Sequence, residues 1–320
     1  MVKKVLITGV SGFAGSFLAD NLIQNEEYQI SGTYLTDNSL QNVDQIKDKI
    51  NLIKVDLMDE GKVEELIFSI KPDLVFHLAA LSSPADSFKN PSQTITNNIT
   101  AQINILEAIK QAGLIGSRIL IISSADIYGA VSQDDLPIDE DTPLKPNNPY
   151  AVSKIAQDFL GLQYFLSYGL QIVRVRPFNH IGPRQSPHFV VASFAKKIAG
   201  IESGKGDGVL TVGNLDAKRD FTDVRDIVRA YVLTLQKGKI GDVYNIGSGA
   251  SYKISDILEK LLSFSSAQIK IQKDQSLLRP SDTPELLCDT TKIRQLTGWE
   301  PQIKIDQTLK ETLDYWREII

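Results

Sequence analysis

The stretch KVLITGVSGFAGSFLADNLI, residues 4–23, decides the fold of this chain. It runs from a short apolar segment through three glycines, Gly9, Gly12 and Gly15, into an apolar pattern with helical spacing. This order predicts a buried strand, a glycine-rich turn and the start of a helix. A helix N-terminus offers free N–H groups and a partial positive charge, and glycines let a pyrophosphate approach without a Cβ in the way. The stretch therefore predicts a phosphate-binding loop.

Apolar, strand-like runs alternate with helical patterns through the first half of the chain. Strands are predicted near residues 4–9, 28–35, 50–57, 73–80, 118–124 and 170–177, and helices near 16–24, 61–70, 100–113 and 151–169. Nearly continuous apolar strands separated by helices indicate a parallel sheet that is covered on both faces. Right-handed crossovers then give an α/β Rossmann fold with a doubly wound parallel sheet, whose ligand crevice lies at the carboxyl ends of the strands.

The pattern becomes irregular after Pro177, where glycines, prolines and polar residues interrupt it. A strand-like run and further helical patterns resume later, the last of them near 305–319. We therefore predict a smaller C-terminal α/β substrate lobe after the main sheet. The predicted division assigns residues 1–177 plus about 220–258 to the Rossmann domain, and 178–219 and 259–320 to the lobe.

The composition limits the class of function. A net charge of -5 over 320 residues argues against non-specific nucleic-acid binding. A single cysteine, Cys288, excludes an internal disulfide and fits a reducing cytoplasm. The sequence has neither a recognisable signal nor a long apolar stretch, so we expect a cytoplasmic protein without a membrane span. Because His77, His180 and His188 lack ligand spacing on one element, no metal is predicted, and His77 is expected to pack within its strand.

Polar side chains gather where the predicted crevice lies. Tyr150 and Lys154 are four residues apart at the start of a helix, so both side chains lie on one face. Ser124 and Asp126 follow an apolar strand at its carboxyl end. A phenol with a pKa near ~10 is a poor acid or base at neutral pH, and a neighbouring ammonium stabilises its phenolate. Beside a phosphate-binding loop, these residues predict acid–base chemistry on a substrate oxygen next to a nicotinamide.

On these residues the chain resembles the extended short-chain dehydrogenases/reductases that act on nucleotide sugars. The resemblance covers nearly the whole chain and is carried by four segments: TGVSGFAG (8–15), VDL (55–57), FHLAA (76–80) and NNITAQINILEA (97–108). In the last segment Asn98 fits the family, although Ala101 replaces a frequent glycine. The resemblance implies that Ser124, Tyr150 and Lys154 form the catalytic triad. It also implies the cofactor contacts Gly9, Gly12, Phe13, Ala14, Gly15, Asp56, Leu57, Leu78, Ala79, Ala80, Asn98, Tyr150 and Lys154.

Three further segments resemble GDP-mannose 4,6-dehydratases and GDP-4-keto-6-deoxymannose reductases within that family: residues 176–185, 212–226 and 278–301. They imply a GDP-linked sugar as the substrate. The residues implied to contact it are Asn179, Arg184, Val190, Arg219, Arg279 and Asp282. Arginine suits a diphosphate, because its guanidinium donates paired hydrogen bonds. Arg184 stands where close relatives usually have glycine, so it either adds a phosphate contact or changes the loop.

The resemblance leaves the reaction open between reduction and dehydration. A 4-ketoreductase needs a hydride, a tyrosine proton donor and a lysine, for which the chain has Tyr150 and Lys154. A 4,6-dehydratase also needs a base for the C5 proton, usually a glutamate, where this chain has the shorter Asp126. The additional acid of some dehydratases falls on Ala125, and the longer loop that completes the dehydratase tetramer is missing.

We therefore favour NADP(H)-dependent reduction of GDP-4-keto-6-deoxy-D-mannose to a sugar of the GDP-D-rhamnose type, with Tyr150 as the proton donor. A GDP-mannose 4,6-dehydratase that uses Asp126, and an NAD-dependent nucleotide-sugar epimerase, are the alternatives. A cofactor-binding regulator without turnover is disfavoured, because both Tyr150 and Lys154 are present.

The cofactor preference depends on the end of the second strand. An acidic residue there binds the adenosine 2′-hydroxyl and selects NAD. Counting along YQISGTYL puts Tyr34 at that position as a cofactor contact, and Asp37 comes too late. Since no acid repels a 2′-phosphate, the sequence favours NADP(H), with NAD(H) still open. The resemblance also implies a homodimer built on the helix that bears Tyr150 and Lys154.

Overall fold

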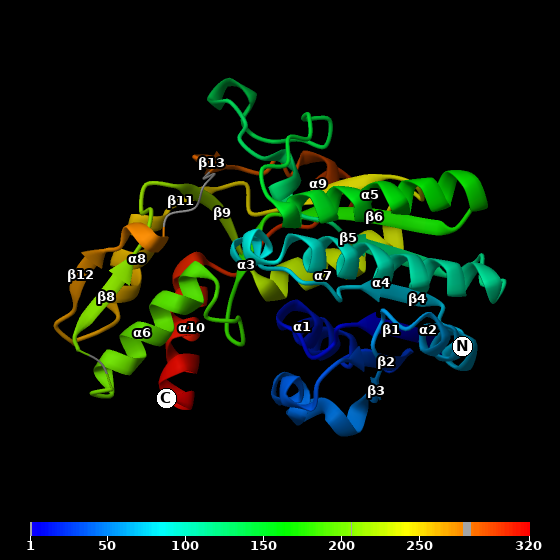
Figure 1. The fold of residues 1–320 in the computed structure, drawn as a ribbon, viewed down its shortest axis with the longest axis horizontal. Helices are drawn as coiled ribbons and strands as arrows, with labels where there is room; N and C mark the ends of the chain where they lie inside the picture. Colours follow the sequence, from blue (N-terminus) through cyan, green and yellow to red (C-terminus); the bar gives the residue numbers. More distant parts are fainter. Residues whose placement is uncertain (1, 206, 278–282) are drawn as a thin grey trace.

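The computed structural model describes residues 2–205, 207–277 and 283–320. Its larger part is a seven-stranded sheet in the order β10-β6-β5-β4-β1-β2-β3, with every pair parallel (Figure 1). The strands are β1 (Lys3–Thr8), β2 (Tyr28–Tyr34), β3 (Asn51–Lys54), β4 (Leu74–His77), β5 (Arg118–Ile122), β6 (Gln171–Pro177) and β10 (Val243–Ile246). The chain builds the sheet outward from β1 in both directions, which confirms the predicted doubly wound α/β fold.

Helices cover both faces of this sheet because successive side chains of a strand point to opposite faces. They are α1 (Phe13–Leu22), α2 (Glu60–Ile70), α3 (Pro84–Lys89), α4 (Pro91–Gln111), α5 (Pro149–Tyr168), α7 (Val224–Lys237) and α9 (Thr291–Thr297). Val5 and Ile7 of β1 belong to the core cluster that holds α1 and α7. Leu6 between them belongs to the cluster that holds α2, α4 and part of α5. The sheet therefore buries both faces, as its apolar strands predict.

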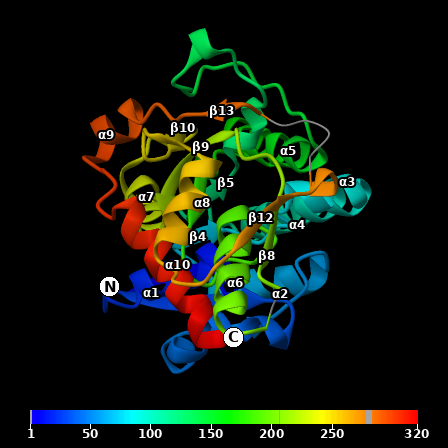
Figure 2. The same cartoon turned by 90° about the vertical axis from the view of Figure 1, so that its left-hand side faces the viewer.

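The smaller part is an α/β lobe on the carboxyl side of the main sheet. Its elements are β7 (Asn179–Ile181), α6 (Val190–Glu202), β8 (Val209–Val212), β9 (Lys218–Asp223), β11 (Ser251–Lys253), α8 (Ile254–Ser263), β12 (Lys270–Lys273), β13 (Glu285–Leu286) and α10 (Ile305–Ile319). β9 pairs with β7, β11 and β13, while β8 pairs with β12. Helices α6, α8 and α10 lie together and share one core cluster (Figure 2).

The boundary between the two parts differs from the predicted division. β9 and β11 fall in the stretch 220–258 or beside it, but they pair in the lobe sheet. Ile293 and Trp299, in the stretch assigned to the lobe, lie in the core against α7. The Trp299 indole Nε1 donates a hydrogen bond to the Asp226 carbonyl at 3.0 Å, which ties this segment to the main domain. The chain thus crosses between the parts several times.

Among the described residues, no helix combines the length and the apolar character that a membrane span requires.

Candidate active site

A cleft of about 720 Å³ opens at the carboxyl ends of the sheet strands, where the doubly wound fold predicts a ligand. One wall comes from the glycine loop and from the residues that follow β2, β3, β4 and β5. The other wall comes from the segment after β6 and from α6, β8 and β9 of the lobe. Both parts of the chain are therefore needed to complete the site.

The glycine loop has the backbone geometry that a dinucleotide requires. Gly9 has a φ of +72°, and a Cβ added to Gly15 would overlap the Gly9 carbonyl oxygen. Gly12 is the N-cap of α1 and makes no side-chain capping hydrogen bond. The first N–H groups of this helix are therefore available to a ligand in the loop. Five predicted cofactor residues of the loop line the cleft: Gly9, Gly12, Phe13, Ala14 and Gly15. The loop and helix thus fit a bound pyrophosphate.

Hydroxyl groups line the end of the cleft beside β2, and the sequence analysis did not single out two of them, Ser11 and Ser39. Tyr34 ends β2 and lines the cleft, as predicted, together with Asp56, Leu57, Leu78, Ala79 and Ala80. Ser11 and Ser39 also line it, and their Oγ atoms are 2.7 Å apart. The carboxylate of Asp37 instead pairs with Lys54 Nζ at 2.6 Å. No carboxylate of the segment after β2 therefore lines this end of the cleft in the described chain.

Asn98, which the family resemblance gives as a structural asparagine and as a cofactor contact, lies behind the cleft. Its side chain is fully buried within α4 and does not line the cleft. Asn98 Oδ1 accepts from the Leu81 N–H at 2.7 Å, and Nδ2 donates to the Leu81 carbonyl at 3.1 Å and to Ser153 Oγ at 2.9 Å. Asn98 therefore fixes the loop after β4, which does line the cleft, against α5.

Arg184, a predicted substrate contact, points away from the cleft. Its guanidinium pairs with Asp20 on α1 at 2.7 Å and lies 4.6 Å from the centre of the Phe17 ring, outside the cleft lining. Arg184 adopts a φ of +67°, a left-handed conformation that costs a non-glycine residue free energy. His180 and Gln185 of the same loop line the cleft instead.

Ser124, Asp126, Tyr150 and Lys154 all line the same cleft, as predicted. Asn148 caps α5 by accepting from the Ala151 N–H at 2.8 Å, which puts Tyr150 in the first helical turn. Lys154 Nζ donates to the Ile122 carbonyl at 2.9 Å and lies 5.9 Å from the centre of the Tyr150 ring. The start of α5 and the end of β5 therefore bring these side chains together.

Burial governs the protonation of the two helical side chains. It raises the pKa of the Tyr150 phenol well above its usual value; the charge of Asp126 raises it further, and a hydrogen bond from Ser124 lowers it. Burial also lowers the pKa of Lys154 from 10.5 to about 7. The phenol thus stays protonated at neutral pH. Because the pKa of Lys154 lies near neutrality, a negative charge that forms on the neighbouring phenol favours the protonated form of Lys154.

Asn179, Val190 and Arg219 line the lobe side of the cleft. Asn179 Oδ1 is buried without a hydrogen-bond partner among the described residues, so it can accept a donor from a ligand. Arg219 Nη1 donates to the carbonyls of Lys218 at 2.8 Å and Thr283 at 2.7 Å. Two predicted substrate residues, Arg279 and Asp282, lie outside the described residues. Lys197 of α6 lines the cleft too, and no motif in the sequence singled it out.

His77 packs in β4, as expected, with its Nδ1 2.9 Å from Thr8 Oγ1. Burial lowers the pKa of His77 from 6.5 to about 3, and the charge of Lys154 lowers it further. Between these pH values only the unfolded chain takes up this proton, so the free energy of unfolding falls as the pH drops from 6.5 towards 3. We expect His77→Gln to flatten this fall by up to about 1.4 kcal/mol per pH unit. Urea unfolding at several pH values measures it, and equal slopes for both proteins would contradict the assignment.

Comparisons with known proteins agree with this geometry. The family model described as GDP-mannose 4,6 dehydratase matches residues 6–312. GDP-6-deoxy-D-mannose reductase of Pseudomonas aeruginosa is 35% identical over 316 residues, which cover 99% of this chain and 98% of that protein. GDP-mannose 4,6-dehydratase of Vibrio cholerae is 29% identical, over 97% of this chain and 93% of that protein.

Solved structures extend the likeness to both parts of the fold. RMD from Pseudomonas aeruginosa complexed with NADPH has a TM-score of 0.87 at 33% identity, over 99% of this chain and 100% of that chain. The UDP-glucose 4-epimerase of Thermus thermophilus in complex with NAD has a TM-score of 0.87 at 26% identity, with the same coverage. The protein is therefore an extended short-chain dehydrogenase/reductase of the kind that modifies nucleotide sugars. Within that class it belongs to the GDP-mannose 4,6 dehydratase family.

Proposed function

We propose that this chain catalyses the NADP(H)-dependent reduction of the 4-keto group of GDP-4-keto-6-deoxy-D-mannose to a GDP-6-deoxy sugar of the GDP-D-rhamnose type. The observation that carries the proposal is the single cleft in which Ser124, Tyr150 and Lys154 stand beside the glycine loop. The 35% identity with a GDP-6-deoxy-D-mannose reductase supports it. The likeness to RMD complexed with NADPH, and the absence of a carboxylate from the segment after β2 in the described cleft lining, support NADP(H).

Each residue of the triad has a distinct role in this reaction. A bound nicotinamide cofactor supplies the hydride. Tyr150, kept protonated by burial, donates its proton to the alkoxide that forms at C4. Ser124 donates a hydrogen bond to the same oxygen and orients the ketone. The Lys154 ammonium, close to the Tyr150 ring, stabilises the phenolate that the proton transfer leaves behind.

A 4,6-dehydratase is the second candidate, because Asp126 supplies a carboxylate in the same cleft. Asp126 lies near enough to Tyr150 for its charge to raise the pKa of the phenol. A carboxylate within reach of C5 is sufficient for proton abstraction. Against this reading, Ala125 next to Asp126 carries no acid.

Two incubations of the purified protein separate the candidates. With GDP-4-keto-6-deoxy-D-mannose and NADPH, we expect the absorbance of the reduced cofactor to fall in proportion to the sugar consumed. With GDP-mannose and catalytic NADP⁺ alone, we expect no 4-keto sugar. Loss of GDP-mannose to a 4-keto product would establish the dehydratase, and an unchanged absorbance in the first incubation would refute the reductase.

Arg219 is proposed to bind the diphosphate of the nucleotide sugar, with Asn179 and Val190 beside it. We expect Arg219→Ala to raise the KM for the sugar nucleotide at least tenfold, because a lost charged hydrogen bond is worth about 1.5–3 kcal/mol. Arg184→Gly is the control, since its guanidinium points to Asp20, and the same KM is expected to change less than about twofold. Steady-state kinetics at saturating NADPH measure both variants. A larger effect at Arg184 than at Arg219 would assign substrate binding to Arg184 instead.

A homodimer is proposed to form on helix α5. This helix exposes Val152, Phe159 and Leu166 by 43%, 49% and 70%, at a spacing of seven residues that puts them on one face. The family resemblance implies that a second copy covers this face. We expect the wild type to sediment as a dimer and Phe159→Glu as a monomer. Sedimentation velocity checks this, and a wild type that remains monomeric at high concentration would rule the dimer out.

A further inference from the structure

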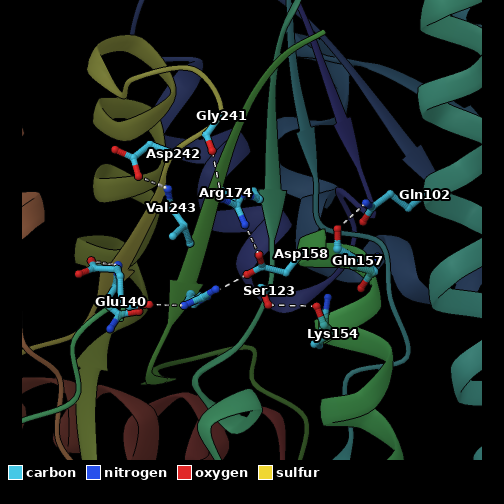
Figure 3. A network of polar contacts seen from close by, with 12 residues as sticks. Gln102, Ser123, Glu140, Lys154, Gln157, Asp158, Arg174, Gly241, Asp242 and Val243 are labelled. Atoms are coloured by element: carbon cyan, nitrogen blue, oxygen red, sulfur yellow. Dashed lines mark hydrogen bonds and ion pairs between the residues drawn. The ribbon is translucent and has the colours of Figure 1, made fainter. Parts of the chain in front are cut away.

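Behind the cleft, buried polar side chains connect the helix that bears Tyr150 to the short helix that follows Ser124. Asp158 of α5 is fully buried and accepts from two arginines of β6 (Figure 3). Its Oδ1 accepts from Arg174 Nη1 at 2.5 Å, and its Oδ2 accepts from Arg176 Nε at 2.8 Å. Both guanidinium groups are at least nine-tenths buried. The catalytic helix is thereby fixed to the neighbouring strand.

Arg176 carries this connection onward to the η2 helix (Ala125–Tyr128). Its Nη1 donates to Tyr128 Oη at 2.9 Å and to the Glu140 carbonyl at 3.0 Å. Tyr128 Oη in turn donates to Asn245 Oδ1 at 2.8 Å on β10. The Tyr128 phenol is therefore held between β6 and β10, with no exposed surface of its own.

These residues lie next to the reacting groups without reaching the cleft. Lys154 precedes Asp158 by one helical turn and Tyr150 precedes it by two, so all three share a face of α5. Ser124 caps η2 by accepting from the Asp126 N–H at 3.2 Å, and Tyr128 is the last residue of η2. Tyr128, Arg176 and Asp158 do not line the cleft. Any influence they have on the reaction must pass through side chains of α5 and η2 that do line it, among them Tyr150 and Ser124.

The charge of this cluster needs an explanation beyond stability. Removing charged groups from water is costly, and well-packed apolar side chains often stabilise a protein as much as a buried ion pair. What the cluster adds is a fixed geometry. The planar guanidinium of Arg176 holds the Asp158 carboxylate and the Tyr128 hydroxyl at set positions relative to each other. One of these groups belongs to α5 and the other to η2. The guanidinium therefore sets the separation of the two helices.

We propose that Tyr128, Arg176 and Asp158 are positioning residues, which hold η2 and α5 at the separation that brings the Ser124 hydroxyl and the Tyr150 phenol together in the cleft. The catalytic role of Ser124 and Tyr150 rests on the proposed function, but the positioning of these two side chains does not. Tyr128→Phe is the sharpest test, because it removes one hydroxyl and leaves the buried charges paired. Tyr164→Phe is the matched control: Tyr164 is also on α5, and its hydroxyl donates to Glu107 Oε1 at 2.6 Å, away from η2.

The first measurement needs no turnover. Tyrosines labelled with ¹³C at Cζ report the hydrogen bonding of each phenol, and Tyr150→Phe identifies the Tyr150 signal by its loss. We expect Tyr128→Phe to move this signal in the same direction as Ser124→Ala, and Tyr164→Phe to leave it in place. A Tyr150 signal that Ser124→Ala moves and Tyr128→Phe does not would overturn the proposal, as would a signal that Ser124→Ala leaves unmoved.

The second measurement is single-turnover hydride transfer at saturating NADPH. We expect Tyr128→Phe to slow it about tenfold or more, because small misplacements of reacting groups have large effects, while the Kd for NADPH and the behaviour of Tyr164→Phe stay near wild type. In a Ser124→Ala background, the further effect of Tyr128→Phe should fall below about twofold. Additive effects would contradict the proposal. A wild type that reduces no sugar would refute the proposed function instead, and the ¹³C result would still decide the positioning.

Discussion

Replacing Tyr150 by phenylalanine is expected to lower kcat by about 10²- to 10⁴-fold, the usual contribution of a positioned general acid. The phenol is 8% exposed and lines the cleft, so the variant loses one hydroxyl and keeps the packing of the ring. Lys154 does not take over this role, because its Nζ donates to the Ile122 carbonyl. Steady-state reduction of the keto sugar measures the loss.

The binding of NADPH separates a chemical role of Tyr150 from a structural one. We expect the Kd of Tyr150→Phe for NADPH, measured by fluorescence titration, to stay within about twofold of the wild type, since the glycine loop and α1 are unchanged. Tyr164→Phe provides a control for the loss of a phenol hydroxyl on the same helix. Retained turnover in Tyr150→Phe would remove it from the proposed mechanism.

Replacing Asp158 by alanine is expected to cost the largest amount of stability of any single change discussed. Asp158 is fully buried and is the shared partner of Arg174 and Arg176, so its loss leaves two buried guanidinium groups without their carboxylate. Removing one partner of a buried ion pair typically costs about 3–5 kcal/mol of the free energy of unfolding. Urea unfolding, with circular dichroism as the probe, measures the change.

Asp314 offers a matched control for Asp158. It also pairs with two cations, Lys310 at 3.0 Å and Arg317 at 2.7 Å, but its side chain is 38% exposed. Exposed ion pairs contribute about 0–1 kcal/mol, so Asp314→Ala should stay within that range. If the two alanine variants lost equal stability, burial would not explain the cost at Asp158.

The main sheet could be predicted because each of its elements carries its own pattern. Apolar runs bounded by turns indicate β1, β5 and β6, and amphipathic spacing indicates α10 at its observed bounds of Ile305–Ile319. The domain boundary could not be predicted in the same way. Pairing of β9 with β7, β11 and β13 joins segments that are far apart in the chain, and no local pattern specifies such pairing.

At the site, too, features that depend on local spacing could be predicted, and features that depend on contacts between distant segments could not. Tyr150 and Lys154 could be predicted because helical spacing fixes their common face. The direction of Arg184 could not, because it depends on a positive φ and on Asp20, which is 164 residues away. The cluster of Asp158, Arg174 and Arg176 was missed for a similar reason. Its partners belong to different elements, and charged residues are usually exposed.

The central claim is that hydride passes from the cofactor to C4 of the sugar and stays there. The most direct test uses NADPH deuterated at the transferred position, with GDP-4-keto-6-deoxy-D-mannose as substrate and NMR spectroscopy of the product. We predict one deuterium at C4 of the GDP-6-deoxy sugar for each NADPH oxidised. A product without deuterium at C4, or a 4-keto sugar formed from GDP-mannose by transfer of its own C4 hydrogen to C6, would contradict the account.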